Sequence, residues 1–213
     1  MNLGDATAFM STILGFRKDQ TANAQIALGA AQEHYENGPI RPWFLLSETL
    51  SIVTAIGERR LPMPADFLAE SDESSLFYSD DEEDEFELVK RDYDYLIKTI
   101  GNKASGLPTS YSTDGVYFNL FPTPDNLYSL KAKMYRKDVS VSTLSASDTN
   151  KWLTFAPNCL IGWAGANLAT GLRDNVALAR FQNLESTAQD QLNRQTEERK
   201  HVNRSYQIGG PHI

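Results

Sequence analysis

Apolar and polar residues alternate along two neighbouring stretches in the middle of the chain. Val116, Phe118 and Leu120 are separated by single residues, and the alternation returns from Tyr128 to Met134. A period of two predicts half-buried strands. The segment Pro122-Thr123-Pro124-Asp125-Asn126 lies between them, and its prolines fix φ and remove two backbone donors, so neither strand can continue through it.

A third strand is expected just before these two. Thr113-Asp114-Gly115 supplies a residue that tolerates positive φ, so Thr109–Ser112 can pair back on Val116–Phe121. The sequence therefore predicts a β-meander over Gly106–Lys137, with Pro122–Asn126 as a stiff corner.

Upstream, Trp43–Pro64 keeps both helical and strand spacing, and its β-branched content with the Gly57-Glu58 turn favours a hairpin. The return strand, Arg59–Met63, contains Pro62 and is predicted to lie at a sheet edge. Pro64 is expected to open a single turn, followed by short strands at Ser75–Tyr78 and Phe86–Lys90 and a brief helix around Leu96.

Helical periodicity marks both ends of the chain. Leu3–Leu14 predicts an amphipathic helix that ends at Gly15, and a second helix is expected from an Asp19 N-cap to Asn37-Gly38-Pro39. Two short helices of this kind cannot form a core alone.

The C-terminal part is also predicted to be helical. Ser145–Asp148 offers N-cap candidates for a helix that carries Trp152, and Pro157 suits the first position of the next. Three glycines in that second helix, Gly162, Gly165 and Gly171, predict close approach of another backbone.

A last helix starts at Asn175, and its apolar stripe stops at Leu192. The polar segment Asn193–Arg204 is expected to project from the core or to lie against another chain. Tyr206–Ile213 contains Gly-Gly-Pro and predicts a tail, which is either a frayed end or a docking segment.

These elements predict an α+β protein, in which a helical bundle from the N- and C-terminal segments carries an inserted antiparallel β-rich lobe. The expected domains are residues 1–41 with 145–204, residues 42–144, and an extended tail, 205–213.

Charge adds one feature to this picture. The formal net charge is −8, and residues 66–94 hold 13 of the 28 carboxylates against only Lys90 and Arg91. This balance disfavours binding to nucleic-acid phosphates. The densest run is predicted to be a solvated loop, with a metal or partner site as the alternative; its members are Asp80, Asp81, Glu82, Glu83, Asp84 and Glu85.

Candidate chemistry is sparse. No phosphate loop, zinc motif, cysteine pair or nucleophile elbow occurs in the sequence. Cys159 is predicted to be a buried thiol, and His34, His201 and His212 to be surface residues. No apolar run is long enough to span a membrane. We therefore expect no cofactor, metal or catalytic residue.

Several blocks together resemble the adaptor, or head-to-tail connector, proteins of short-tailed bacteriophages. The matching blocks are RPWFLLSETL at 41–50, LPMPADFL at 61–68, GLPTSY at 106–111, FPTPDNLYSLKAKMYRK at 121–137, and a helical ending with Trp152, Pro157-Asn158, Leu160 and Leu172-Arg173-Asp174. The resemblance covers residues 41 to about 195. The acidic DDEEDE insert and the Gly-Gly-Pro tail depart from the pattern.

The resemblance implies a structural virion protein without enzymatic activity, at the junction of capsid and tail. Such a subunit forms a homo-oligomeric ring of twelve copies beneath the portal, extends the DNA channel without specific DNA binding, and offers a docking surface to the next tail or nozzle protein. The acidic run 80–85 is then a candidate channel surface or an outward loop. Portal docking is expected of the C-terminal end; the residues named for it are Arg204, Tyr206, Ile208 and Ile213.

Two alternatives remain open from the sequence. One is a tail-tube or head-completion subunit of different stoichiometry. The other is a small hydrolase that uses the acidic cluster as a metal site, which predicts a monomer or dimer with a pocket.

Overall fold

The computed structural model describes residues 1–15, 17–71, 75–79 and 85–207. Within it the chain forms two compact units. One contains Met1–Leu45 and Lys137–Ile213, here called the helical unit, and the other is Leu46–Arg136, the β unit. The domains expected from the sequence, residues 1–41 with 145–204, residues 42–144 and the tail 205–213, remain a prediction. The six α-helices and two sheets of the described residues confirm the α+β class.

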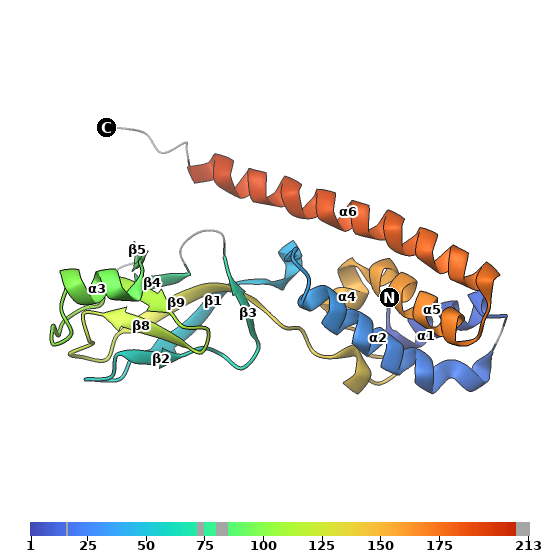
Figure 1. The fold of residues 1–213 in the computed structure, drawn as a ribbon, viewed down its shortest axis with the longest axis horizontal. Helices are drawn as coiled ribbons and strands as arrows, with labels where there is room; N and C mark the ends of the chain where they lie inside the picture. Colours follow the sequence, from blue (N-terminus) through green and yellow to red (C-terminus); the bar gives the residue numbers. More distant parts are fainter. Residues whose placement is uncertain (16, 72–74, 80–84, 208–213) are drawn as a thin grey trace. The chain divides into compact units, whose positions relative to one another are not determined.

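The helical unit is formed by elements from both ends of the chain (Figure 1). Its elements are α1 (Leu3–Ile13), η1 (Lys18–Gln20), α2 (Thr21–Glu36), η2 (Trp43–Leu45), η3 (Val141–Thr143), α4 (Lys151–Phe155), α5 (Pro157–Gly171) and α6 (Asn175–Gln207). Asn2 closes a capping box with Asp5 at the start of α1, and Gly15 has the positive φ expected after its end. Pro157 occupies the first turn of α5, as predicted.

The packing of α5 confirms the predicted close approach of another backbone at one of the three glycines, Gly162, whereas the neighbour of Gly165 is a side-chain ring. Helix α5 lies along α6 and against α2. A Cβ at Gly162 would lie 2.6 Å from the backbone nitrogen of Glu185, and one at Gly165 would lie 2.3 Å from the ring of Phe181. The prediction for Gly171 is wrong, because open space surrounds that position.

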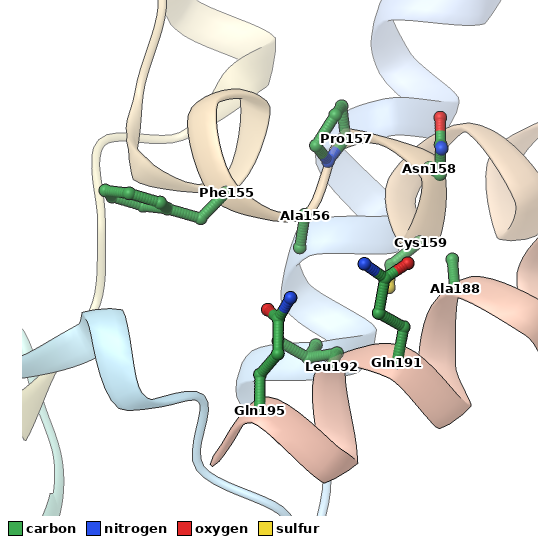
Figure 2. Close-up of a pocket in the computed structure, with 9 residues that line it drawn as sticks. All are labelled: Phe155, Ala156, Pro157, Asn158, Cys159, Ala188, Gln191, Leu192 and Gln195. Atoms are coloured by element: carbon green, nitrogen blue, oxygen red, sulfur yellow. The ribbon is translucent and has the colours of Figure 1, made fainter. Parts of the chain in front are cut away.

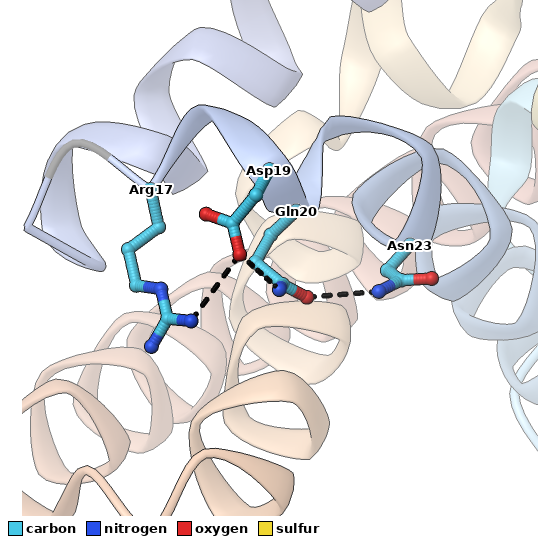
Figure 3. A network of polar contacts seen from close by, with 4 residues as sticks. All are labelled: Arg17, Asp19, Gln20 and Asn23. Atoms are coloured by element: carbon cyan, nitrogen blue, oxygen red, sulfur yellow. Dashed lines mark hydrogen bonds and ion pairs between the residues drawn. The ribbon is translucent and has the colours of Figure 1, made fainter.

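Two predicted N-caps are wrong. Helix α2 has Gln20 at its N-cap position without a side-chain cap, because the short helix η1 precedes it. The Asp19 carboxylate instead accepts hydrogen bonds from Arg17 at 3.2 Å and from Gln20 at 2.8 Å, in the small network of Figure 3. The Arg17 hydrogen bond is the main reason that the pKa of Asp19 is lowered. Helix α4 is capped by Asn150, beyond the predicted Ser145–Asp148, since the Asn150 side chain accepts from the Leu153 backbone.

The β unit contains two sheets and one helix. The first sheet has the order β1-β9-β4-β5, with β3 also paired to β9, and the second has the order β2-β8-β7-β6. The elements are β1 (Leu46–Val53), β2 (Arg60–Pro62), β3 (Phe67–Glu70), β4 (Leu76–Ser79), β5 (Glu85–Glu87), β6 (Val89–Lys90), α3 (Tyr93–Thr99), β7 (Ser110–Thr113), β8 (Tyr117–Phe121) and β9 (Ser129–Arg136).

The predicted meander is correct in its strands and wrong in its last pairing. Strands β7 and β8 pair antiparallel through the turn at Asp114-Gly115, as predicted. Strand β9, however, pairs with β1, β3 and β4 in the other sheet. The reason is the corner Pro122–Asn126, which passes the chain from one sheet to the other instead of returning it to β8.

The predicted hairpin over Trp43–Pro64 is corrected in the same way. Both strands form, but β1 pairs with β9 and β2 pairs with β8, so they lie in different sheets. Pro62 lies in an edge strand, as predicted. The turn after Pro64 ends sooner than expected, because Phe67 already begins β3.

The two sheets share one apolar core. It contains residues of both sheets, which are Leu61, Leu88, Tyr111, Phe118 and Leu120 with Leu76, Leu130, Ala132 and Met134. Tyr111 is fully buried, and desolvation raises the pKa of its hydroxyl to about 12. Five of the alternating residues that predicted the strands fill this core, namely Phe118, Leu120, Leu130, Ala132 and Met134, whereas Val116 is exposed.

The net charge is confined to one of the two units. Residues 46–136 hold 17 of the 28 carboxylates and 9 of the 20 Lys and Arg residues, so the β unit carries −8, whereas the helical unit has 11 of each and is neutral.

Searched over the described residues, no helix combines the length and apolarity that a membrane span requires.

Candidate docking surfaces

A groove on the helical unit lies where α4 meets α5, opposite α6. It encloses a cavity of about 150 Å³. Figure 2 shows Phe155 and Ala156 at the joint, Pro157 and Asn158 at the start of α5, and Gln191 and Gln195 reaching toward them from α6. Side-chain amides of α6 therefore face an apolar joint between α4 and α5.

A second pocket of about 380 Å³ adjoins this groove and shares Phe155 and Gln195 with it. Trp43, Thr154, Glu198 and Arg199 complete its lining. The Arg199 guanidinium carbon lies 3.6 Å from the centre of the Trp43 ring, which is a cation–π contact. Trp43 also packs against Phe155, with ring centres 4.9 Å apart.

This contact corrects the prediction for the polar end of the last helix. The segment after Leu192 was expected to project or to lie against another chain, yet Thr196 is fully buried and Arg199 covers Trp43. The sequence contains a signal for this, because Gln191, Gln195 and Arg199 recur every four residues and so share one face of α6. A stripe of amide and guanidinium groups is not apolar, so hydrophobic periodicity does not detect it.

A buried polar network joins α2 to the segment that follows the β unit. The Glu36 carboxylate accepts hydrogen bonds from Trp152 Nε1 at 3.0 Å, Gln32 Nε2 at 2.9 Å and the Asp138 backbone at 3.2 Å. Gln32 in turn accepts from the Val141 backbone at 2.9 Å. An open pocket of about 300 Å³ lies beside this network. Because each group is paired, we assign the network a structural role.

Cys159 is buried, as predicted. Burial raises the pKa of its thiol to about 12, so the thiolate needed for a nucleophile does not form near neutral pH. The neighbouring Tyr35 hydroxyl donates to Glu185 at 3.3 Å, and burial raises its pKa as well. His34 is exposed and stacks on Trp163, as expected of a surface histidine.

Of the six residues in the acidic run, only Glu85 lies among the described residues. Glu85 begins β5 and forms an ion pair of 2.6 Å with Lys131 on β9, where both side chains are partly exposed. Asp80, Asp81, Glu82, Glu83 and Asp84 lie outside the described residues. Among the described residues, no group of three His, Cys, Asp or Glu side chains is placed to hold a metal ion.

The residues named for portal docking also lie beyond what the structure describes in detail. Helix α6 continues to Gln207, so the backbone at Arg204 and Tyr206 is helical and the prediction of a tail that starts at 205 is wrong. The helix continues to Gln207 because no glycine or proline interrupts the sequence between Asn175 and Gln207. Ile208 and Ile213 lie outside the described residues.

The corner Pro122–Asn126 is held by hydrogen bonds to the segment after β1. The Thr54 backbone donates to Tyr128, its hydroxyl donates to the Asn126 carbonyl, and Gly57 donates to the Pro124 carbonyl at 2.8 Å. Thr54 is buried, whereas Ile56 and Leu127 on the same tip are exposed. The corner is therefore a fixed feature of the β unit, and the neighbouring residues Ile56 and Leu127 present apolar side chains beside it.

In a comparison with protein-family models, residues 1–208 match the model of the SU10 adaptor protein family. No curated protein matches the chain. A match of this extent includes the helices of both ends and the inserted sheets, and it agrees with the adaptor blocks quoted from the sequence. The chain therefore belongs to the SU10 adaptor protein family and is a structural adaptor protein of bacteriophages.

Proposed function

We propose that this protein is the subunit of a ring that joins the capsid portal to the tail and extends the channel for DNA. The observation that carries the proposal is the family match over residues 1–208, which spans both units. The ring has twelve copies, is assembled in the host cytoplasm, and contacts the portal on one side and the next tail or nozzle protein on the other. A tail-tube or head-completion subunit is the second candidate.

The distribution of charge supports the channel. A surface with excess carboxylates does not retain DNA, because retention requires cations that neutralise phosphates and release their counterions. The β unit has this excess, with a net charge of −8. We assign the channel surface to the acidic run from Asp80 to Glu85.

Portal docking is assigned to the end of the chain, with Arg204, Tyr206, Ile208 and Ile213 as the contact residues. A segment that orders on docking is a common device in assembly. Subunits of a closed ring meet heterologously, so the two sides of each copy must differ and match.

Light scattering on purified protein, with and without the cognate portal, tests this function. We expect a ring-sized complex when the portal is present. A chain that stays monomeric and never joins the portal would count against the ring. A truncated variant that lacks residues 205–213 should keep its helical circular dichroism and lose portal association, and unchanged association would exclude the assignment of docking to the tail.

A further inference from the structure

The pocket at Trp43 and Arg199 is lined by two side chains whose donors have no acceptor among the described residues. Arg199 forms no ion pair with any described residue, and its charge lies over an aromatic ring. The indole Nε1 of Trp43 is buried and lacks a hydrogen-bond partner among the same residues. A buried donor without an acceptor costs about 1–3 kcal/mol, so an acceptor that reached the edge of the Trp43 ring would relieve this cost.

The chemistry of these groups indicates which kind of group completes the pocket. A guanidinium that rests on an aromatic face keeps its N–H groups free along its edge, where a carboxylate can be bound. The Gln195 amide on the same wall adds a further donor. A carboxylate oxygen is the acceptor that matches a cation and neutral donors together.

Glu198 limits what can enter. It lines the same pocket and opposes any anion that approaches from its side. The pocket therefore favours a single carboxylate held at Arg199 over a multiply charged anion. The adjoining groove, with Phe155 48% exposed, has room and apolar surface for residues flanking that carboxylate.

We propose that this pocket binds a carboxylate side chain from the β unit of a neighbouring copy of the same chain. Charge complementarity selects this partner, because every copy has eight surplus negative charges in residues 46–136, while its helical unit is neutral and Arg199 has no ion pair with a described residue. The inference rests on the proposed ring, in which each copy adjoins two others.

Substitutions at three positions of α6 test the charge. Arg199→Gln should weaken self-association on the portal about tenfold, because it removes one interface ion pair. Arg194→Gln is the matched control, since Arg194 is exposed on the same helix and lines neither pocket, and it should change association less than about twofold. Glu198→Gln should strengthen association, because it removes the opposing carboxylate. Sedimentation of the full chain with portal at several salt concentrations measures all three.

The outcomes separate the two proposals. If the wild-type chain never assembles, the ring and this contact fail together. If the wild type assembles and Arg199→Gln assembles equally well, the contact fails and the ring stands. If Arg199→Gln also lowers the melting temperature of the monomer, weaker assembly of this variant does not distinguish a lost contact from a less stable fold. A second measurement, which leaves Arg199 intact, then tests the contact.

That second measurement places the photo-crosslinker benzoylphenylalanine at position 155 in assembled complexes of mixed ¹⁴N- and ¹⁵N-labelled chains. We expect mixed-isotope crosslinks from position 155 to residues within 46–136. Crosslinks only within one chain, only to the portal or another protein, or to no peptide at all would each overturn the contact.

Discussion

Helices α5 and α6 pack closely because two residues of α5, Gly162 and Gly165, have no side chain. Gly162 faces the backbone of Glu185, and Gly165 faces the ring of Phe181. A methyl group at either position would require the two helices to separate, since a real Cβ is essentially never found below 3.0 Å from another atom. The position of α6, and with it the groove and the Trp43 pocket, is set by these two residues.

The first prediction concerns these glycines. Gly162→Ala should lower the free energy of unfolding by about 1–3 kcal/mol, because the methyl group meets backbone that cannot move aside. Gly171→Ala is the control: open space surrounds Gly171, so the higher helix propensity of alanine should leave stability unchanged or raise it by up to about 1 kcal/mol. Urea unfolding followed by far-ultraviolet circular dichroism measures both, and equal effects would refute the close-packing argument.

Single residues were predictable where one physical property decides their place. Cys159 is small and lies in an apolar stretch, and it is buried. Asp19 was predicted to cap α2, and that prediction is wrong. Its carboxylate bonds to Arg17 and Gln20, which offer nearer partners than the start of α2 does. The Trp43 pocket was not predicted because the two side chains in contact there, Trp43 and Arg199, are separated by more than 150 positions in the sequence.

At the scale of elements, Glu36 connects α2 to the chain that returns from the β unit. Its carboxylate accepts three hydrogen bonds and is 4% exposed. Two of the donors, Trp152 Nε1 and the Asp138 backbone, lie more than 100 positions further along the sequence. One side chain thus holds the beginning and the end of the helical unit together.

The second prediction follows from this arrangement. Glu36→Ala should destabilise the helical unit by at least about 2 kcal/mol, because it leaves buried donors without an acceptor. Glu33→Ala removes an exposed carboxylate one turn earlier on the same helix and should change stability by less than about 0.5 kcal/mol. Thermal unfolding of the two variants and the wild type makes the comparison. If Glu36→Ala is as stable as Glu33→Ala, the network does not hold the unit together.

Strands and helices could be located from the sequence, while their partners could not. A period of two shows which residues face the core, but it does not show which neighbour each strand pairs with. The corner Pro122–Asn126 and the turn at Gly57 both suggested hairpins, and both instead transfer the chain between sheets. The core that the two sheets share decides which strands pair with each other, and a local sequence pattern contains no information about that core.

At the scale of the whole molecule, the β unit is an insertion whose ends meet. Leu46 pairs with Tyr135 across β1 and β9, so the chain enters and leaves the unit at neighbouring positions. The unit contains its own core and all of the net charge. The helical unit contains the groove, the Trp43 pocket and the Glu36 network.

The third prediction tests this division. A variant in which a linker of about four Gly and Ser residues replaces residues 46–136 should still fold, because such a linker spans about 13 Å and paired strands are about 5 Å apart. We expect a helical spectrum, a cooperative thermal transition and weak retention on an anion exchanger. The isolated segment 46–136 should fold as well and be retained strongly. A linker variant that melts without cooperativity would show that the helical unit depends on the insertion.

The pairing of Leu46 with Tyr135 also has a mechanical meaning. The β unit is attached by two covalent crossings, at residues 45–46 and 136–137, and the strands that continue from them are hydrogen-bonded to each other. A force that pulls the β unit away from the helical unit is therefore divided between two lengths of backbone. Neither strand bears the whole force, so the connection between the two units can transmit tension without β1 and β9 separating from one end.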